Sequence, residues 1–257
     1  MLGTDFRTGS PIWIDLGSPD IEGTAAFYGA VFGWRFVSAG PEAGGYGYFQ
    51  KDGKTVAAAG ALTEQGARPA WMTYFRTVDV HSAVGAVTAA GGALRAEPVN
   101  LGEAWMAQVT DPQGAQFAVA QSGDGIQLAS RDDTLVWVEL HTRDPEAAVA
   151  FYRGLFGWRS QEMSAPGMTY RVLSVADGDQ QEGSFGGVAP LQGGQEEARW
   201  VPYFAVADTD ATVTVARDND GTVLMPPADV PGVGRIAWLT DPSGAVFAIL
   251  RPNPRQA

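Results

Sequence analysis

The chain has 257 residues, of which 29 are acidic and 17 are basic, so its formal net charge is −12. This acidity disfavours nucleic acid and anionic membrane surfaces as partners, because both carry negative charge. No cysteine is present, which excludes disulfides, thiolate metal sites and a cysteine nucleophile, and only His81 and His141 can supply imidazole chemistry. No segment approaches the roughly 20 apolar residues of a membrane-spanning helix, and we expect a soluble, cytoplasmic protein.

The predicted elements follow one another in the same order twice along the chain. Strict apolar alternation predicts a strand, and apolar spacing of three and four residues after an aspartate predicts a helix that ends at a glycine. In the first half we expect a strand at 12–17, a helix from Asp20 to Gly33, strands near 46–50 and 56–62, a strand at 71–78, a helix at 80–90, a strand at 93–96 and a hairpin turn at 111–114. The second half repeats this order, with a strand at 136–141, a helix from Asp144 to Gly157 and a strand near 170–175.

The two halves also match residue by residue, which indicates an internal duplication. The matching segments are 12–17 with 136–141, 27–35 with 151–159, 71–79 with 200–208, and 110–117 with 240–247. We therefore predict a first domain at 1–121, a polar linker at 122–134 and a second domain at 135–257. Each half is expected to contain two strand-helix-strand-strand-strand modules, and the pairing of the four modules, within or across the halves, stays open.

Three motifs resemble those of a known superfamily. They are a Phe-Tyr pair seven residues after an aspartate (Phe27-Tyr28), a Thr-Asp-Pro-x-Gly-Ala hairpin (Thr110–Ala115) and the four-module order. Over about residues 10–121 and 135–251 the chain resembles the vicinal-oxygen-chelate superfamily, which includes glyoxalase I, extradiol dioxygenases and bleomycin-resistance proteins. The resemblance implies an α+β fold, in which tandem βαβββ modules form two curved, mixed-sheet half-barrel domains.

A narrower resemblance rests on the Trp-x-Asp/Glu-Leu opening of each half, the Phe-Gly-Trp ending of its first helix, and Pro226-Pro227 followed by Gly234-Arg235. These features resemble a two-domain actinobacterial group within the superfamily. That group includes a mycobacterial glyoxalase-like culture-filtrate antigen and accessory proteins of antibiotic gene clusters.

The superfamily's enzymes generally hold a divalent ion, and the resemblance implies where its ligands would lie. One set stands seven residues before the aspartate that opens each helix, and another stands four residues after the glycine of the hairpin turn. Here these positions carry Trp13, Met72, Trp137, Val201, Ala118 and Ala248. None of these side chains suits a hard or borderline divalent ion, so we expect no metal and no cofactor. A site built on Glu139 and His141 would need a second imidazole, and His81 is expected on an exposed helix start.

Strand periodicity places a set of aromatic and polar side chains on the concave faces of the predicted sheets. The expected ligand-binding residues are Trp13, Trp137, His141, Tyr74, Tyr203, Met72, Arg76 and Gln116. Asp15 and Glu139, which are equivalent in the repeat, are candidate catalytic residues. Alternatively, the aromatic side chains only fill the core, and the two carboxylates are anchored to backbone or to tyrosine hydroxyls. Arg76 and Arg235 would either pair with these acids or neutralise an anionic ligand.

Three functions fit these features. The first is metal-independent binding of a hydrophobic or aromatic small molecule, such as a polyketide-type metabolite or antibiotic, for sequestration, resistance or assistance of a biosynthetic step. The second is a glyoxalase-like lyase, isomerase or oxygenase that acts through Asp15 or Glu139, or through an unrecognised metal site. The third is a structural or interaction protein with filled clefts. Either a monomer or a homodimer is expected.

Overall fold

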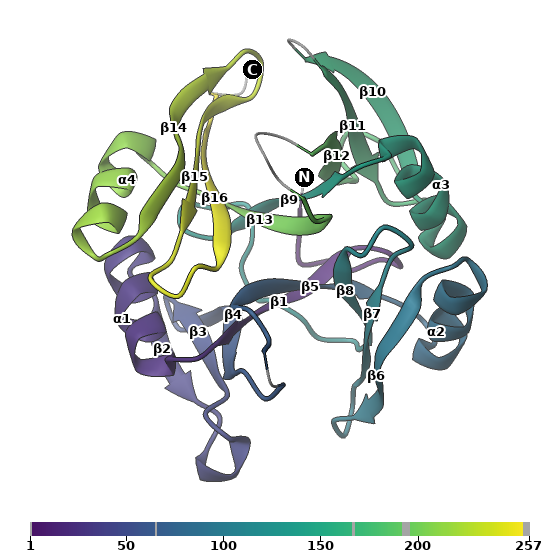
Figure 1. Ribbon diagram of the computed structural model, residues 1–257, viewed down its shortest axis with the longest axis horizontal. Helices are drawn as coiled ribbons and strands as arrows, with labels where there is room; N and C mark the ends of the chain where they lie inside the picture. Colours follow the sequence, from purple (N-terminus) through teal and green to yellow (C-terminus); the bar gives the residue numbers. More distant parts are fainter. Residues whose placement is uncertain (1, 65, 166–167, 192–195, 254–257) are drawn as a thin grey trace. The chain divides into compact units, whose positions relative to one another are not determined.

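The computed structural model describes residues 2–64, 66–165, 168–191 and 196–253, and it contains four βαβββ modules in the predicted order (Figure 1). Module 1 comprises β1 (Pro11–Ser18), α1 (Ile21–Phe32), β2 (Arg35–Ser38), β3 (Gly47–Lys51) and β4 (Lys54–Ala61), with a short 3-10 helix at Pro41–Ala43. Module 2 comprises β5 (Ala70–Arg76), α2 (Val80–Ala89), β6 (Ala93–Asn100), β7 (Trp105–Thr110) and β8 (Gln116–Gln121). Module 3 comprises β9 (Leu135–Thr142), α3 (Pro145–Phe156), β10 (Arg159–Ala165), β11 (Met168–Ser174) and β12 (Ser184–Pro190). Module 4 comprises β13 (Arg199–Ala205), α4 (Thr209–Asp218), β14 (Thr222–Val230), β15 (Gly234–Thr240) and β16 (Val246–Pro252).

The strands form two mixed sheets with the same topology. Their orders are β2-β3-β4-β1-β5-β8-β7-β6 and β10-β11-β12-β9-β13-β16-β15-β14. Within each module the first strand pairs in parallel with the last one, and the remaining strands pair antiparallel. The α+β fold with tandem modules and mixed sheets is therefore confirmed.

Helix ends agree with the sequence prediction because short local contacts determine them. Asp20, Asp79, Asp144 and Asp208 are the N-caps of the four helices, and each side chain accepts a backbone N–H of the first turn. The first and third helices end at Gly33 and Gly157, whose φ angles of 68° and 70° lie in the left-handed region that glycine adopts without strain.

One strand prediction was too short. The strand expected at 93–96 continues to Asn100 as β6, and its pairing with β7 shifts register between Leu94 and Ala96 and again between Ala96 and Val99. Pro98 lies in the second irregularity, where a missing backbone N–H does not interrupt a regular ladder. Irregular pairing of this kind leaves no alternating pattern in the sequence, so the sequence did not indicate the full length of the strand.

The chain folds into two compact units that do not follow the halves of the sequence. Unit 1 contains residues 1–13, 72–125 and 137–201, and unit 2 contains residues 14–71, 126–136 and 202–257. Four of the boundaries between the units lie inside the first strand of a module, namely β1, β5, β9 or β13. Unit 1 thus combines most of modules 2 and 3, and unit 2 combines most of modules 1 and 4.

The core of unit 2 is joined across the repeat by a tyrosine hydroxyl. Tyr28 on α1 donates to Asp241 Oδ2 at 3.4 Å and accepts the indole N–H of Trp71 at 3.0 Å. Asp241 also accepts the backbone N–H groups of Ser243 and Ala245, which closes its own hairpin turn. Helix α1 packs beside α4 in this unit. The aspartate of the hairpin motif therefore serves both its own turn and a helix from the other half of the chain.

Unit 1 repeats this arrangement. Tyr152 on α3 donates to Asp111 Oδ2 at 3.2 Å and accepts the indole N–H of Trp200 at 2.9 Å. Burial raises the pKa of Asp111, and it raises the pKa of Tyr152 well above its usual value, so the phenol keeps its proton. The tyrosine of each Phe-Tyr motif thus donates a hydrogen bond to the aspartate of a hairpin motif. Within each unit, this bond joins modules from opposite halves of the chain.

Candidate functional site

A buried hydrogen-bonded chain runs through module 3 of unit 1. The indole N–H of Trp137 donates to the Tyr170 hydroxyl at 2.9 Å, and that hydroxyl donates to Glu139 Oε2 at 2.6 Å. The other carboxylate oxygen lies 2.6 Å from His141 Nε2. Glu139 and His141 are only 8% and 2% exposed. Because they stand two residues apart on β9, both project from one face of the sheet, as predicted, whereas Tyr170 on β11 was not among the predicted site residues.

A glycine makes room for this chain. Strand β12 lies between β9 and β11, and Gly187 of β12 is the register partner of Glu139. A Cβ added at Gly187 would lie 2.0 Å from the Tyr170 hydroxyl oxygen. The phenol therefore passes directly over the glycine to reach the carboxylate.

Module 1 has an alanine at the position equivalent to that glycine, and its tyrosine ring lies over a different glycine, Gly60. Its equivalent residues are Tyr46 and Asp15, and the register partner of Asp15 is Ala58. The Tyr46 hydroxyl donates to Asp15 Oδ2 at 3.5 Å, compared with 2.6 Å in module 3. Module 1 thus has a shorter acid, Asp15, and a methyl group on the intervening strand, from Ala58. Its contact between tyrosine and carboxylate is longer than the one in module 3. Both candidate carboxylates accept a tyrosine hydroxyl, which was one of the two alternatives open from the sequence.

The donors in the hydrogen-bonded chain around Glu139 follow from the chemistry of its groups. Burial and the neighbouring carboxylate raise the pKa of Tyr170 well above its usual value, so this hydroxyl remains a donor. With the carboxylate ionised, the contact at 2.6 Å is a hydrogen bond donated by the His141 tautomer that carries its hydrogen on Nε2. The arrangement is a fixed carboxylate held by an imidazole and a phenol.

Other predicted residues of unit 1 have different surroundings. Trp13 and Met72 are partly buried against an apolar cluster of Ile12, Tyr74, Ala118 and Ala120. Arg76 Nε donates to the Ser122 carbonyl at 3.3 Å, and Gln116 is exposed and accepts from the Arg95 guanidinium. His81 is exposed on α2, as expected, with its ring edge-on to Trp105 at 5.2 Å.

In unit 2, Tyr203 accepts the indole N–H of Trp238 at 3.1 Å, and the two rings are nearly perpendicular. Sequence reasoning did not single out Trp238. Arg235 pairs with Asp210 at 2.6 Å and with Asp229 at 3.1 Å. Its expected alternative partners, Asp15 and Glu139, are not among these contacts.

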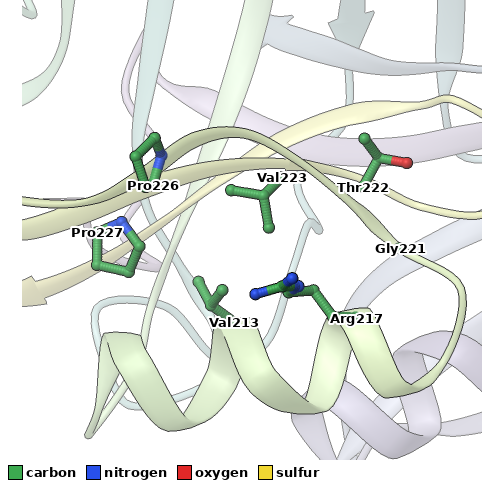
Figure 2. A pocket seen from close by; sticks show the side chains of 7 residues that line it. All are labelled: Val213, Arg217, Gly221, Thr222, Val223, Pro226 and Pro227. Carbon is green, nitrogen blue, oxygen red and sulfur yellow. The ribbon is translucent and has the colours of Figure 1, made fainter.

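Two cavities lie away from the predicted site residues. A groove of about 450 Å³ in unit 2 lies between α4 and β14, and Figure 2 shows its lining. A pocket of about 360 Å³ in unit 1 is lined by the segments 2–11 and 175–185. Neither lining includes a predicted catalytic or ligand-binding residue, so the roles of those residues stay predictions.

The donor set does not fit a divalent metal ion. Across the described ranges, no group of three or more His, Cys, Asp or Glu side chains is placed to hold one. The strand positions that the resemblance assigns to ligands carry indole, thioether and aliphatic side chains. Glu139 and His141 are bonded to each other, and His81 lies on an exposed helix start.

The profile of the Glyoxalase/Bleomycin resistance protein/Dioxygenase superfamily matches residues 11–119 and 134–249. The chain belongs to this superfamily. It is 37% identical to CFP32 of Mycobacterium bovis, with 98% of both chains covered. The name of CFP32 describes it as a glyoxylase. This superfamily member is also 38% identical to the anthracycline biosynthesis protein DnrV of Streptomyces peucetius, with 96% of this chain and 94% of DnrV covered.

Solved structures of the superfamily share the fold. The Mn(II)-bound glyoxalase from Novosphingobium aromaticivorans superposes with a TM-score of 0.62 at 16% identity, covering 97% of this chain and 86% of that one. The 2,2',3-trihydroxybiphenyl 1,2-dioxygenase of Sphingomonas wittichii gives a TM-score of 0.67 at 10% identity, covering 95% and 91%. Within the described part of this superfamily member, no helix has the length and apolar character to cross a membrane.

Proposed function

We propose that this superfamily member binds a flat, hydrophobic small molecule without a metal ion, and that the β9 face of unit 1 recognises it. The observation that carries this proposal is the chain from Trp137 through Tyr170 to Glu139. Trp137 stands where the resemblance assigns a metal ligand, and it offers an aromatic surface in place of a metal donor. Large flat side chains with a few fixed polar groups suit an aromatic ligand.

The names of two relatives support a proposal for the class of ligand. DnrV and DauV are named as anthracycline biosynthesis proteins, and the chain is 38% and 37% identical to them over nearly its whole length. We infer a planar, polyketide-type aromatic ligand, which the protein sequesters or presents during a biosynthetic step. The half-buried Trp137 ring would contact the face of the ligand, and the Glu139 carboxylate, held by His141 and Tyr170, would orient a polar edge. The cytoplasm is the proposed location, with a monomer or homodimer as the working species.

Tryptophan fluorescence tests the proposal, with 1,2-dihydroxyanthraquinone as the first probe. We expect saturable quenching in the wild type, weakened at least about fivefold by Trp137→Phe. Trp238→Phe, which removes an indole from unit 2, serves as the matched control and should leave the affinity unchanged. Unchanged fluorescence across a panel of planar aromatics contradicts the proposal. So does a stoichiometric divalent ion in protein purified without a chelator.

A second candidate function is supported by one feature, the contact of the buried Glu139 carboxylate with the Tyr170 hydroxyl and with His141 Nε2, each at 2.6 Å. Such a carboxylate could exchange a proton with a substrate, with His141 as its partner, in a metal-free isomerase or lyase reaction. Glu139→Gln separates the two functions. Lost turnover with intact binding indicates acid/base catalysis, whereas weaker binding without any turnover in the wild type indicates recognition.

A further inference from the structure

The groove between α4 and β14 in unit 2 is lined by both apolar and polar groups, and one of its side chains is cationic. Val213 and Arg217 stand one turn apart on α4 and project toward β14, as Figure 2 shows. The lining comprises Val213, Arg217, Gly221, Thr222, Val223, Pro226 and Pro227, and it contains no acidic residue. Its volume of about 450 Å³ is within the range of small-molecule sites.

Irregular pairing of β14 accompanies the groove. The register of β14 against β15 shifts between Val223 and Met225 and again between Met225 and Ala228. Pro226 and Pro227 fall in the second shift, and as the last strand of its sheet β14 tolerates their missing N–H groups. Their short rigid rings provide an apolar wall. The groove lining also includes Gly221, where an added Cβ would meet the Ala216 carbonyl oxygen at 2.8 Å.

Arg217 forms no ion pair within the described part of the chain. Its guanidinium is exposed and makes no hydrogen bond or ion pair with any described residue. Of the acids on α4 and β14, Asp210 and Asp229 pair with Arg235, and Asp218, which follows Arg217 in the chain, forms no ion pair with it. An arginine fork beside an apolar wall is suited to a carboxylate attached to a hydrophobic body.

The internal repeat provides a natural comparison. With the offset of 129 that relates Asp208 to Asp79, Arg217 corresponds to Thr88 and Pro226 to Glu97. The Thr88 hydroxyl bonds back to helix carbonyls, those of Val84 and Gly85. At these two positions module 2 therefore has a neutral side chain and an acid. The cation of the groove is thus specific to module 4 at this pair of equivalent positions.

We propose that the α4–β14 groove is a second binding site, which takes a small planar hydrophobic carboxylate. The guanidinium of Arg217 pairs with the carboxylate of the ligand, and the apolar body lies against Val213, Val223 and the two prolines. This site is separate in its residues from the β9 face, and the proposal does not depend on the function proposed for that face.

The test is an NMR titration of the full chain with 2-naphthoate, followed through the methyl groups of Val213 and Val223 and the amide of Gly221. We expect saturable shifts at these three residues. The neutral analogue 2-naphthylmethanol should bind at least about tenfold more weakly, because it lacks the charge that pairs with the guanidinium. Added salt should weaken naphthoate binding and have little effect on the neutral analogue.

Two substitutions copy module 2 into the groove. Arg217→Thr removes the cation and Pro226→Glu adds an acid, and each should weaken naphthoate binding at least about tenfold. Arg68→Thr is the matched control, since it removes an equal charge from another exposed position of unit 2 and should leave binding unchanged. Wild-type shifts that are absent or confined to other residues would overturn the proposal. Equal affinities in the wild type and Arg217→Thr would do so as well.

Discussion

The tyrosine that joins modules from opposite halves should be a principal contributor to the stability of each unit. Tyr152→Phe removes one buried hydroxyl and leaves two groups without their partner, the indole N–H of Trp200 and Oδ2 of Asp111. A buried polar group left unsatisfied costs about 1–3 kcal/mol. Asp111 keeps two backbone N–H bonds on its other oxygen, so its share should be at the lower end. We expect the free energy of unfolding to fall by about 2–4 kcal/mol.

Tyr28→Phe is the equivalent change in unit 2 and gives an internal comparison. The contact of Tyr28 with Asp241 is 3.4 Å, against 3.2 Å for Tyr152 with Asp111, so Tyr28→Phe should cost the same or slightly less. Since the two tyrosines share no partner, the losses should add in the double variant to within about 0.5 kcal/mol.

Urea unfolding, monitored by circular dichroism and by tryptophan fluorescence, measures these losses. A lower midpoint with an unchanged slope reports the change in stability. The indole N–H signals of Trp71 and Trp200 in a ¹⁵N-correlated NMR spectrum should shift in the respective variants, because each loses its acceptor. A loss below about 0.5 kcal/mol in both single variants, a size typical of ordinary surface substitutions, would refute the reasoning.

Three further predictions concern two glycines and one buried acid. Gly187→Ala places a Cβ 2.0 Å from the Tyr170 hydroxyl oxygen, so it should break the contact with Glu139 and cost about 1–3 kcal/mol in urea unfolding; an unchanged midpoint would contradict the crossing of the phenol over β12. Gly33→Ala should cost about 1–2 kcal/mol from backbone strain alone, because φ is 68° and nothing lies within 4 Å of the added Cβ. For Asp111, burial raises the pKa in the folded state, so the stability linked to its proton is present at acidic pH and is lost as the pH rises through that raised value. Asp111→Asn does not titrate there, and the wild type should lose stability relative to this variant over that interval, as a pH series of urea midpoints would show.

Much of the candidate site could be predicted from local pattern. Alternation along β9 placed Glu139 and His141 on one face, and the structure finds them bonded at 2.6 Å. Tyr170 was missed because it reaches the carboxylate from β11 across an intervening strand. Its alignment with Tyr46 at the repeat offset of 124, together with the two carboxylates at that same offset, was the signal that could have found it.

The groove beside α4 could not be predicted in this way. An exposed arginine and two prolines have no periodic signature, and the prolines lie in a strand whose pairing has two register shifts. Trp238 was missed for a related reason, since its partner Tyr203 lies on a strand that reaches it only through the folded sheet.

The sequence by itself determined the number of modules, the limits of the helices and the absence of thiol chemistry. These properties depend on residues close together in the chain, such as an aspartate cap three positions before the N–H that it accepts. Only the tertiary structure decided which modules share a core. Tyr28 and Asp241 are 213 residues apart, and the sequence pattern of neither segment identifies the other as its partner. The two duplicated halves carry nearly the same apolar faces, so local pattern fits pairing within or across them, and the partner of each face is determined only when the whole chain buries it.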